Sequence, residues 1–118
     1  MAKQSPTQRT LKWLRDSGWQ VAITERWCPF SRRRIDLFGF IDLLAVRPES
    51  TIGVQCTSQS NAAARVTKIL SLPSAKEWLA GGQRKIWVIG WRKIKKSRRW
   101  EPDIREVLIG DFEQEGAA

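Results

Sequence analysis

Two apolar segments separated by a turn-rich break carry polar residues that a simple core hairpin would not contain. The first segment, Phe40–Val46, includes Asp42, and the second, Ile52–Thr57, includes Gln55. If the two segments pair as a β-hairpin, Asp42 faces Gln55 across the strands. Side chains alternate between the two faces of a strand, so Thr57 is expected on the same face as Gln55. A carboxylate, an amide and a hydroxyl are therefore predicted to converge in an apolar environment.

This convergence indicates a binding site. Burial of polar groups costs free energy unless they form hydrogen bonds or bind a ligand. Divalent metal ions prefer oxygen ligands, and these three side chains offer oxygen atoms. The alternative interpretation is that Gln55 and Thr57 form a hydrogen-bonded pair with a purely structural role.

Residue usage narrows the chemistry that the chain can perform. The sequence contains no histidine, which excludes Ser-His and Cys-His catalysis and histidine metal ligation. Its two cysteines, Cys28 and Cys56, fit no metal-binding spacing and are expected to be reduced thiols. Cys56 should point away from Gln55, into the core. Catalysis would have to use carboxylates, hydroxyls, Lys, Arg or a metal held by oxygen.

Length and charge define the class of protein and of partner. The chain has 118 residues, of which 42% are hydrophobic, and we expect residues 1–118 to form one domain. No apolar run approaches the roughly 20 residues of a membrane span, and no hydrophobic signal segment begins the chain, so a soluble cytoplasmic protein is expected. The net charge of +9 favours a polyanionic partner. Nucleic acid is the first candidate and an anionic membrane surface the second.

Periodicity and capping residues predict an α/β (α+β) fold with a mixed central sheet. The strand after the helical crossover is expected to run parallel to a neighbouring strand. The expected elements are a helix over residues 5–17, a strand over 19–24, an irregular segment over 25–34, paired strands over 35–46 and 52–57, helices over 62–70 and 74–81, a strand over 86–91, a charged connection over 92–103, a strand over 104–109 and a disordered tail over 113–118.

This order of elements, with an acid in one hairpin strand and a Q-x-T segment in the next, resembles the PD-(D/E)xK nuclease superfamily. The similarity covers roughly residues 5–92 and is closest to the small archaeal-type and phage Holliday junction resolvases. It implies an αβββαβ restriction-endonuclease-like core. It also implies that Asp42 matches the Asp of the motif and that residues 55–57 occupy the triplet, since Asp42 and Gln55 are 13 positions apart. The implied cofactor is Mg²⁺ or Mn²⁺, held by Asp42, Gln55 and the Cys56 backbone carbonyl.

The triplet departs from the motif of that superfamily. Gln55 replaces its acid and Thr57 replaces its lysine, so one negative and one positive charge are missing. Asp36 shares parity with Asp42 along the expected strand and could restore the negative charge, although it could also pair with Arg34 or Arg33. Some members of the superfamily carry the lysine on the following helix, which implies a catalytic role for Lys68; the alternative is a solvated surface lysine. Glu25, at the end of the preceding strand, is a further candidate acid.

Basic residues lie in two segments that flank the expected site. Arginine and lysine suit backbone phosphates, and an aromatic ring can stack on an exposed base. Without a zinc finger or a basic zipper, the pattern favours recognition of backbone and shape. The expected nucleic-acid-binding residues are Arg32, Arg33, Arg34, Arg65, Arg92, Lys93, Lys95, Lys96, Arg98, Arg99 and Trp100.

Three functions remain open on the sequence. The resemblance implies a metal-dependent, structure-selective DNA endonuclease, specifically a Holliday junction resolvase, with Asp42, Gln55, Thr57, Lys68 and Asp36 as catalytic residues. Such an enzyme would act as a homodimer on branched or duplex DNA, because a junction requires two symmetric cuts. The second function is a DNA-binding protein that retains a nuclease scaffold but does not cleave. The third is an RNA-binding accessory protein, which only the charge supports.

Overall fold

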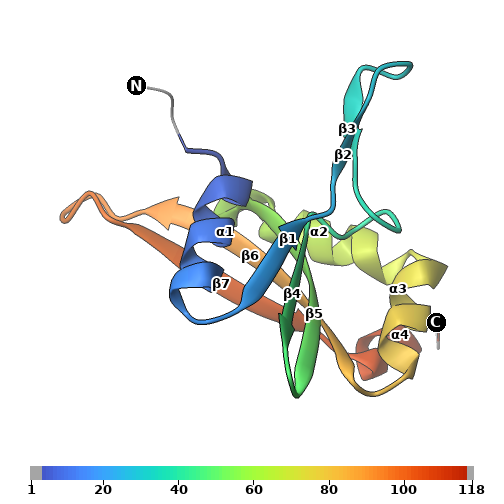
Figure 1. The fold of residues 1–118 in the computed structure, drawn as a ribbon. Helices are drawn as coiled ribbons and strands as arrows, with labels where there is room; N and C mark the ends of the chain where they lie inside the picture. Colours follow the sequence, from blue (N-terminus) through green and yellow to red (C-terminus); the bar gives the residue numbers. More distant parts are fainter. Residues whose placement is uncertain (1–3, 117–118) are drawn as a thin grey trace.

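The computed structural model describes the backbone of residues 4–116 and the side chains of residues 4–112 (Figure 1). Its helices and strands are α1 (Pro6–Asp16), β1 (Gln20–Ile23), β2 (Arg26–Cys28), β3 (Arg33–Ile35), β4 (Leu43–Arg47), β5 (Ser50–Ser58), α2 (Gln59–Leu70), α3 (Pro73–Ala80), β6 (Arg84–Lys93), β7 (Trp100–Val107) and α4 (Ile109–Gly116). None of the helices within the described residues is long and apolar enough to cross a membrane.

The main sheet has five strands in the order β1-β4-β5-β6-β7. Strands β5 and β6 run parallel, and the other neighbours are antiparallel. The predicted mixed α/β class is therefore confirmed, as is the parallel strand after the helical crossover. Strands β2 and β3 pair with each other in a separate two-stranded sheet.

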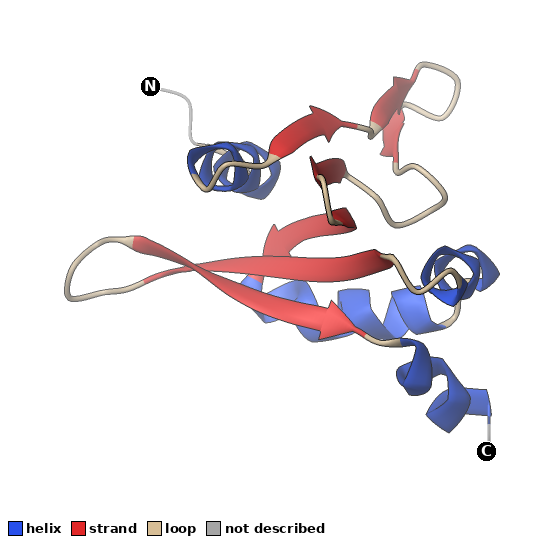
Figure 2. Cartoon of the chain, turned by 60° about the horizontal axis from the view of Figure 1, so that its bottom comes forward, coloured by secondary structure: helices blue, strands red, loops and turns tan. Residues whose placement is uncertain are grey.

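Helices cover both faces of the five-stranded sheet (Figures 1 and 2). Helix α1 packs on one face, where Leu11 and Leu14 join Val54 and Cys56 in a hydrophobic cluster. Helices α2, α3 and α4 contribute to a second cluster on the other face. Successive residues of β5 alternate between these layers, as a strand requires.

Helix α1 is fixed at both its start and its middle. Ser5 caps it by accepting a hydrogen bond from the Gln8 amide at 3.1 Å, as the capping pattern predicts. The buried Thr10 hydroxyl donates to the Pro6 carbonyl at 2.7 Å and accepts from the Trp91 indole at 2.9 Å. Both hydrogen-bonding roles of this hydroxyl are filled, so the α1 layer has a satisfied polar contact to β6.

Helix α2 lies very close to β6. The close contact occurs at Gly90, where an added Cβ would lie 2.9 Å from the Cα atom of Gln59. Real Cβ atoms essentially never come so near a backbone atom, so the contact requires glycine. Gly90 pairs in register with Thr57 of β5. The first turn of α2 therefore lies directly over the end of β5 that carries Gln55 and Thr57.

The region between β1 and β4 differs most from the prediction. Residues 25–34 were expected to be irregular, but they include the paired strands β2 and β3. Residues 35–46 were expected to form one strand, but β4 begins only at Leu43. Between them, residues 37–41 turn back on themselves, with positive φ at Phe38 and Gly39. The amides and carbonyls of Leu37 and Ile41 are reciprocally bonded at 3.0 Å.

The last third of the chain contains more regular structure than the sequence predicts. The expected connection over residues 92–103 is part of a long β6–β7 hairpin, and Pro102 fits because β7 is an edge strand. Helix α3 starts at Pro73, and Ser74 donates to the Phe38 carbonyl at 2.7 Å instead of capping the helix. The expected tail, residues 113–118, continues α4 to Gly116, and residues 117–118 lie outside the described residues.

Candidate metal centre

Asp42 is held rigidly at the entrance to β4. Its amide donates to the Val54 carbonyl at 2.9 Å, and its carbonyl accepts from the Thr24 amide at 2.9 Å. Its Oδ2 atom accepts from the Cys56 amide at 2.8 Å, because β4 pairs with β5 only up to Val54 and leaves that amide free. The residue is 3% exposed. The carboxylate therefore occupies a fixed, buried position at the end of the β4–β5 pairing.

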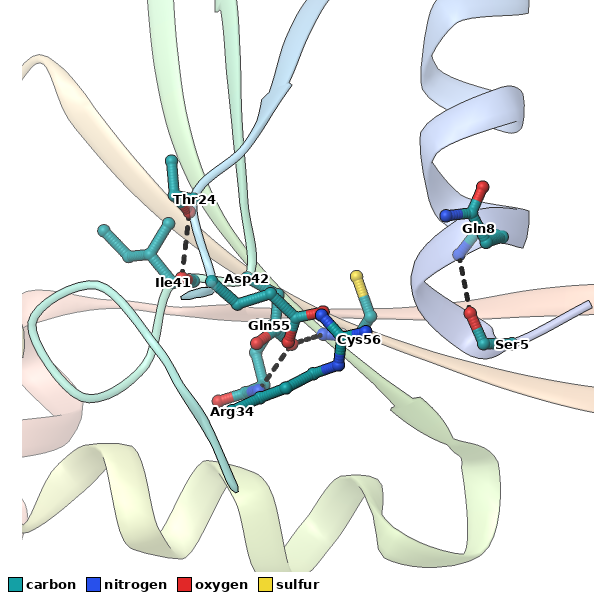
Figure 3. Close-up of polar contacts among 9 residues, drawn as sticks. Ser5, Gln8, Thr24, Arg34, Ile41, Asp42, Gln55 and Cys56 are labelled. Atoms are coloured by element: carbon teal, nitrogen blue, oxygen red, sulfur yellow. Dashed lines mark hydrogen bonds and ion pairs between the residues drawn. The ribbon is translucent and has the colours of Figure 1, made fainter. Parts of the chain in front are cut away.

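Gln55 meets Asp42 as the hairpin register predicts (Figure 3). Its Nε2 atom donates to Asp42 Oδ2 at 2.7 Å and approaches Asp36 Oδ2 at 3.4 Å. The residue is 2% exposed, and its Oε1 atom has no hydrogen-bond partner among the described residues. An unpaired buried acceptor costs free energy, and satisfied polar groups are the rule in protein interiors. This oxygen is therefore available to a ligand.

Asp36 reaches the same place by a route that the sequence did not predict. Shared parity along one strand was the wrong reason for its proximity, since residues 36–42 are not a continuous strand. The turn over residues 37–41 instead brings Asp36 back beside Asp42. Gly39 provides one of the positive φ angles that this turn needs. Asp36 is half-buried.

Glu25 completes a group of three acids. It follows β1, and its amide is directed to the Asp42 carbonyl at 3.3 Å. Its side chain is 12% exposed and lies 3.7 Å from the Arg34 guanidinium. Glu25, Asp36 and Asp42 each offer a carboxylate oxygen within 4.8 Å of the others. We refer to these three residues as the carboxylate cluster, which could hold a metal ion.

Burial and nearby like charge perturb the protonation of Asp42. Burial raises the pKa of Asp42 from its ordinary 3.8 to about 8, and hydrogen bonding to Asp36 adds to the rise. The Cys56 amide opposes this shift, while the nearby charges of Asp36 and Glu25 reinforce it. Without a cation, Asp42 therefore holds a proton near neutral pH. A divalent cation would displace this proton and relieve the repulsion.

The rest of the triplet lies where the strand alternation predicts. Thr57 is buried on the face of Gln55, and no hydrogen bond joins its hydroxyl to the carboxylate cluster among the described side chains. The Cys56 thiol points into the α1 layer, and burial raises its pKa. The amide and the carbonyl of one strand residue point to the same edge, so the Cys56 carbonyl lies on the edge of β5 that faces Asp42. The Val54 carbonyl lies on the same edge, where it accepts from the Asp42 amide.

The two basic residues predicted on α2 differ in exposure. Lys68 is exposed in the last turn of the helix, and Arg65 is half-buried. Neither forms an ion pair with the carboxylate cluster within the described part of the chain. Arg34 of β3 is the basic residue that does so (Figure 3). The sequence predicted Arg34 as a nucleic-acid-binding residue or as a partner of Asp36, and not as a partner of Glu25.

Most of the predicted nucleic-acid-binding residues lie on two hairpins. Arg92, Lys93, Lys95, Lys96, Arg98, Arg99 and Trp100 form the exposed tip of the β6–β7 hairpin, which we call the basic tip. The Trp100 ring is covered by the Arg9 guanidinium, 3.9 Å from its centroid, so this face is not free to stack on a base. Arg32 and Arg33 are exposed on the β2–β3 hairpin.

Both hairpins leave the main sheet at the end where the carboxylate cluster lies. Strand β5 ends where Ser58 pairs with Trp91, and the basic tip continues beyond that pair. Strand β1 ends at Ile23, opposite Leu43, and leads directly to Glu25 and β2. The two hairpins then diverge, as Figures 1 and 2 show. The carboxylate cluster thus lies at the base of the β2–β3 hairpin and at the end of the sheet from which the basic tip extends.

The sequence predicted two parts of the site unequally. Glu25 was named as a further candidate acid, and its position directly after the strand that pairs with β4 brings it to the carboxylate cluster. Arg34 was placed in a loop, because the three-residue strand β3 is too short to show periodicity. Comparisons with protein-family models, with curated proteins and with solved structures found no match to this chain.

Proposed function

We propose that this protein is a metal-dependent endonuclease that hydrolyses phosphodiester bonds in branched DNA. The observation that carries the proposal is the buried Gln55 Oε1 atom, which lacks a partner beside three mutually close carboxylates. An acid cluster with one buried and two half-buried carboxylates and a buried unpaired acceptor are each costly in isolation, and one divalent cation would compensate for both.

The residues fit Mg²⁺ or Mn²⁺. All the available ligand atoms are oxygens: the carboxylates of Asp42, Asp36 and Glu25, the Gln55 amide and the Cys56 carbonyl. Hard divalent cations prefer such ligands, and Mg²⁺ needs only one or two carboxylates besides water and substrate phosphate. When bound, the ion would activate a water molecule and polarise the phosphoryl oxygen.

The protein side chains would divide the remaining work. Asp42, fixed by the Cys56 amide, would give the site a rigid anchor. Glu25 and Asp36 would supply the negative charge that the Gln55 replacement removes. Arg34, at 3.7 Å from Glu25, would stabilise charge on the phosphate, because its planar guanidinium suits phosphate geometry. It would fulfil the electrostatic role of the missing lysine, which leaves Lys68 as a second candidate.

The arrangement of elements also supports the resemblance to the resolvases of the PD-(D/E)xK superfamily. The order α1-β1-β4-β5-α2-β6 follows the αβββαβ core of that superfamily, with β2 and β3 inserted before the acidic strand and α3 between α2 and β6. The proposal extends to a homodimer that makes two symmetric cuts in a four-way junction. The basic tip and Arg32–Arg34 would contact the DNA backbone.

A second candidate is a DNA-binding protein that does not cleave. Thr57 stands in the triplet where a lysine would be expected, and no lysine pairs with the carboxylate cluster among the described side chains. This observation favours binding over catalysis, and an assay for cleavage separates the two functions.

The deciding experiment is cleavage of four-way junction, flap and linear duplex DNA with Mg²⁺ or Mn²⁺. We expect wild type to cut branched DNA, Asp42→Ala to lose cutting, and Asp103→Ala to retain it. Asp103 is a matched control because it is an acid on β7 that pairs with Arg105, away from the cluster. Tight binding without cutting by any of the three proteins would refute the nuclease and support the second candidate.

A further inference from the structure

The β2–β3 hairpin carries the most exposed aromatic residue of the described chain. Phe30, in its turn, is 97% exposed, and Trp27 of β2 is 56% exposed. Figure 1 shows this hairpin projecting away from the helices and from the main sheet. Large apolar side chains at such a position mark an interaction site, since exposure of them has no benefit in solution. We call residues 26–35 the arginine arm.

The charge of the arginine arm indicates a polyanionic partner. Residues 26–35 include four arginines and no acid. Arg26, Arg32 and Arg33 are exposed, and Arg34 pairs across the hairpin with Trp27. Trp27 therefore shares a strand face with the one arginine that contacts the carboxylate cluster, through Glu25. Cationic groups would hold phosphates while the aromatic rings remain free to contact bases.

We propose that Phe30, supported by Trp27, stacks on an unpaired base at a branch point or distortion in DNA. Aromatic side chains stack on bases of any sequence, but only where the base is not already stacked within a duplex. The arginine arm would thus select DNA structure, while the phosphate contacts of its arginines supply affinity. This inference rests on the proposed function, because it assigns the substrate of the same site.

The length of the arm sets a distance between recognition and cleavage. Phe30 is five positions after Glu25, and an extended chain rises about 3.3 Å per residue, so the Cα atoms of these two residues lie at most about 17 Å apart along the arm. DNA advances about 3.4 Å per nucleotide along one strand. The cut is therefore expected within about five nucleotides of the base that Phe30 contacts.

The test measures binding in EDTA, so that no cleavage is required. The probe is a four-way junction with 2-aminopurine at the branch point, compared with a linear duplex of the same sequence. Loss of one stacked base should weaken binding of Phe30→Ala to the junction by about 5- to 100-fold, with the linear duplex changed less than about twofold. Phe30→Tyr should keep the affinity and the fluorescence change of the wild type, whereas Phe30→Leu should lose the fluorescence change.

The controls separate this inference from the proposed nuclease. Ile104→Ala removes an exposed apolar residue of β7 and should leave junction binding unchanged. Asp42→Ala should retain the Phe30-dependent fluorescence change; if neither it nor wild type cuts DNA, the nuclease is refuted while the stacking role is supported. An equal loss of junction and duplex binding in Phe30→Ala would overturn the stacking role. Phe30-dependent binding to anionic phospholipid vesicles, with DNA binding unaffected, would also overturn it.

Discussion

The two faces of the main sheet differ in how their buried polar groups are satisfied. On the α1 side, the buried Thr10 hydroxyl of α1 both donates to Pro6 and accepts from Trp91. On the α2 side, Gln55 Oε1 of β5 is equally buried but has no partner among the described residues. Satisfied polar groups are the rule in protein interiors, so the first contact is explained by stability alone. The second is the exception that supports the proposed metal site.

Replacement of Asp42 should have the largest effect, which is a loss of metal affinity on the α2 face of the sheet. Asp42→Asn keeps the shape but removes the charge, so affinity for Mn²⁺ should fall by about 100-fold or more, as expected when a metal ligand is lost. Isothermal titration calorimetry checks the affinity, with Asp103→Asn as the control for a surface acid. Equal Mn²⁺ affinity of Asp42→Asn and wild type would exclude the carboxylate cluster as the metal site.

The dependence of stability and of Mn²⁺ affinity on pH should be nearly as large an effect as the loss of Asp42. Asp42 holds its proton up to a pKa of about 8 in the folded chain and only to about 3.8 when exposed. The folded state therefore binds more protons between these values, so the stability from this group is complete below about pH 3.8 and is lost as pH rises through 8. Because a cation must displace the proton, Mn²⁺ affinity should rise about tenfold per pH unit below pH 8.

The measurement compares wild type with Asp42→Asn, since Glu25, Asp36 and Arg34 also face this carboxylate. Thermal unfolding from pH 5 to 9 without metal should slope downward in wild type and be flatter in the variant. If the two slopes coincide, Asp42 does not titrate in this range.

Replacement of Thr10 tests the satisfied face. Thr10→Val leaves the buried Trp91 indole N–H without an acceptor, which should lower the free energy of unfolding by about 1–3 kcal/mol. Mn²⁺ affinity should not change. Thr67→Val is a matched control, because Thr67 donates to the carbonyl four residues earlier but is exposed. Urea denaturation of both variants gives the comparison, and equal losses would mean that the Trp91 contact contributes nothing.

An acid restored at position 55 of the triplet should strengthen metal binding on the α2 face. Gln55→Glu adds a carboxylate beside Asp42 and Asp36, which should raise Mn²⁺ affinity by about tenfold because a charged ligand binds a hard cation more strongly. The same change should destabilise the metal-free protein through like-charge repulsion. Calorimetry with Mn²⁺ and thermal unfolding in EDTA test the two effects, and a variant that loses affinity would contradict a ligand role for residue 55.

The smallest effect is expected at Arg34. Its side chain is 64% exposed and its contact with Glu25 is long, so Arg34→Ala should change the free energy of unfolding by less than about 1 kcal/mol. Loss of a nearby positive charge should raise Mn²⁺ affinity by up to about threefold, while any DNA cleavage falls. A large loss of stability would show that Arg34 has a structural role that the ion pair does not explain.

The central part of the site was predictable from the sequence because it depends on strand periodicity. Pairing of the segments around residues 42 and 55 follows from their apolar pattern, and the register then brings Asp42 to Gln55. Helix α1 and the parallel strand β6 were predictable for similar reasons, from a capping residue and from a continuous apolar run.

The remaining parts of the site depend on features without such a pattern. Asp36 arrives through a turn that relies on positive φ at Phe38, a residue that rarely adopts that conformation. Strands β2 and β3 have three residues each and are rich in arginine, so their sequence predicts a loop. The outer part of the β6–β7 hairpin is solvated on both faces, so its charged residues hide the alternation.

The contact between Gly90 and Gln59 has a consequence for the depth of the site. Because Gly90 has no Cβ atom, the first turn of α2 packs directly on β6 and covers the end of β5 at Thr57. Any larger residue would lift that turn away from β6 and open a space above Thr57. The close fit of helix and strand over this end of β5 therefore depends on the absence of a single Cβ atom.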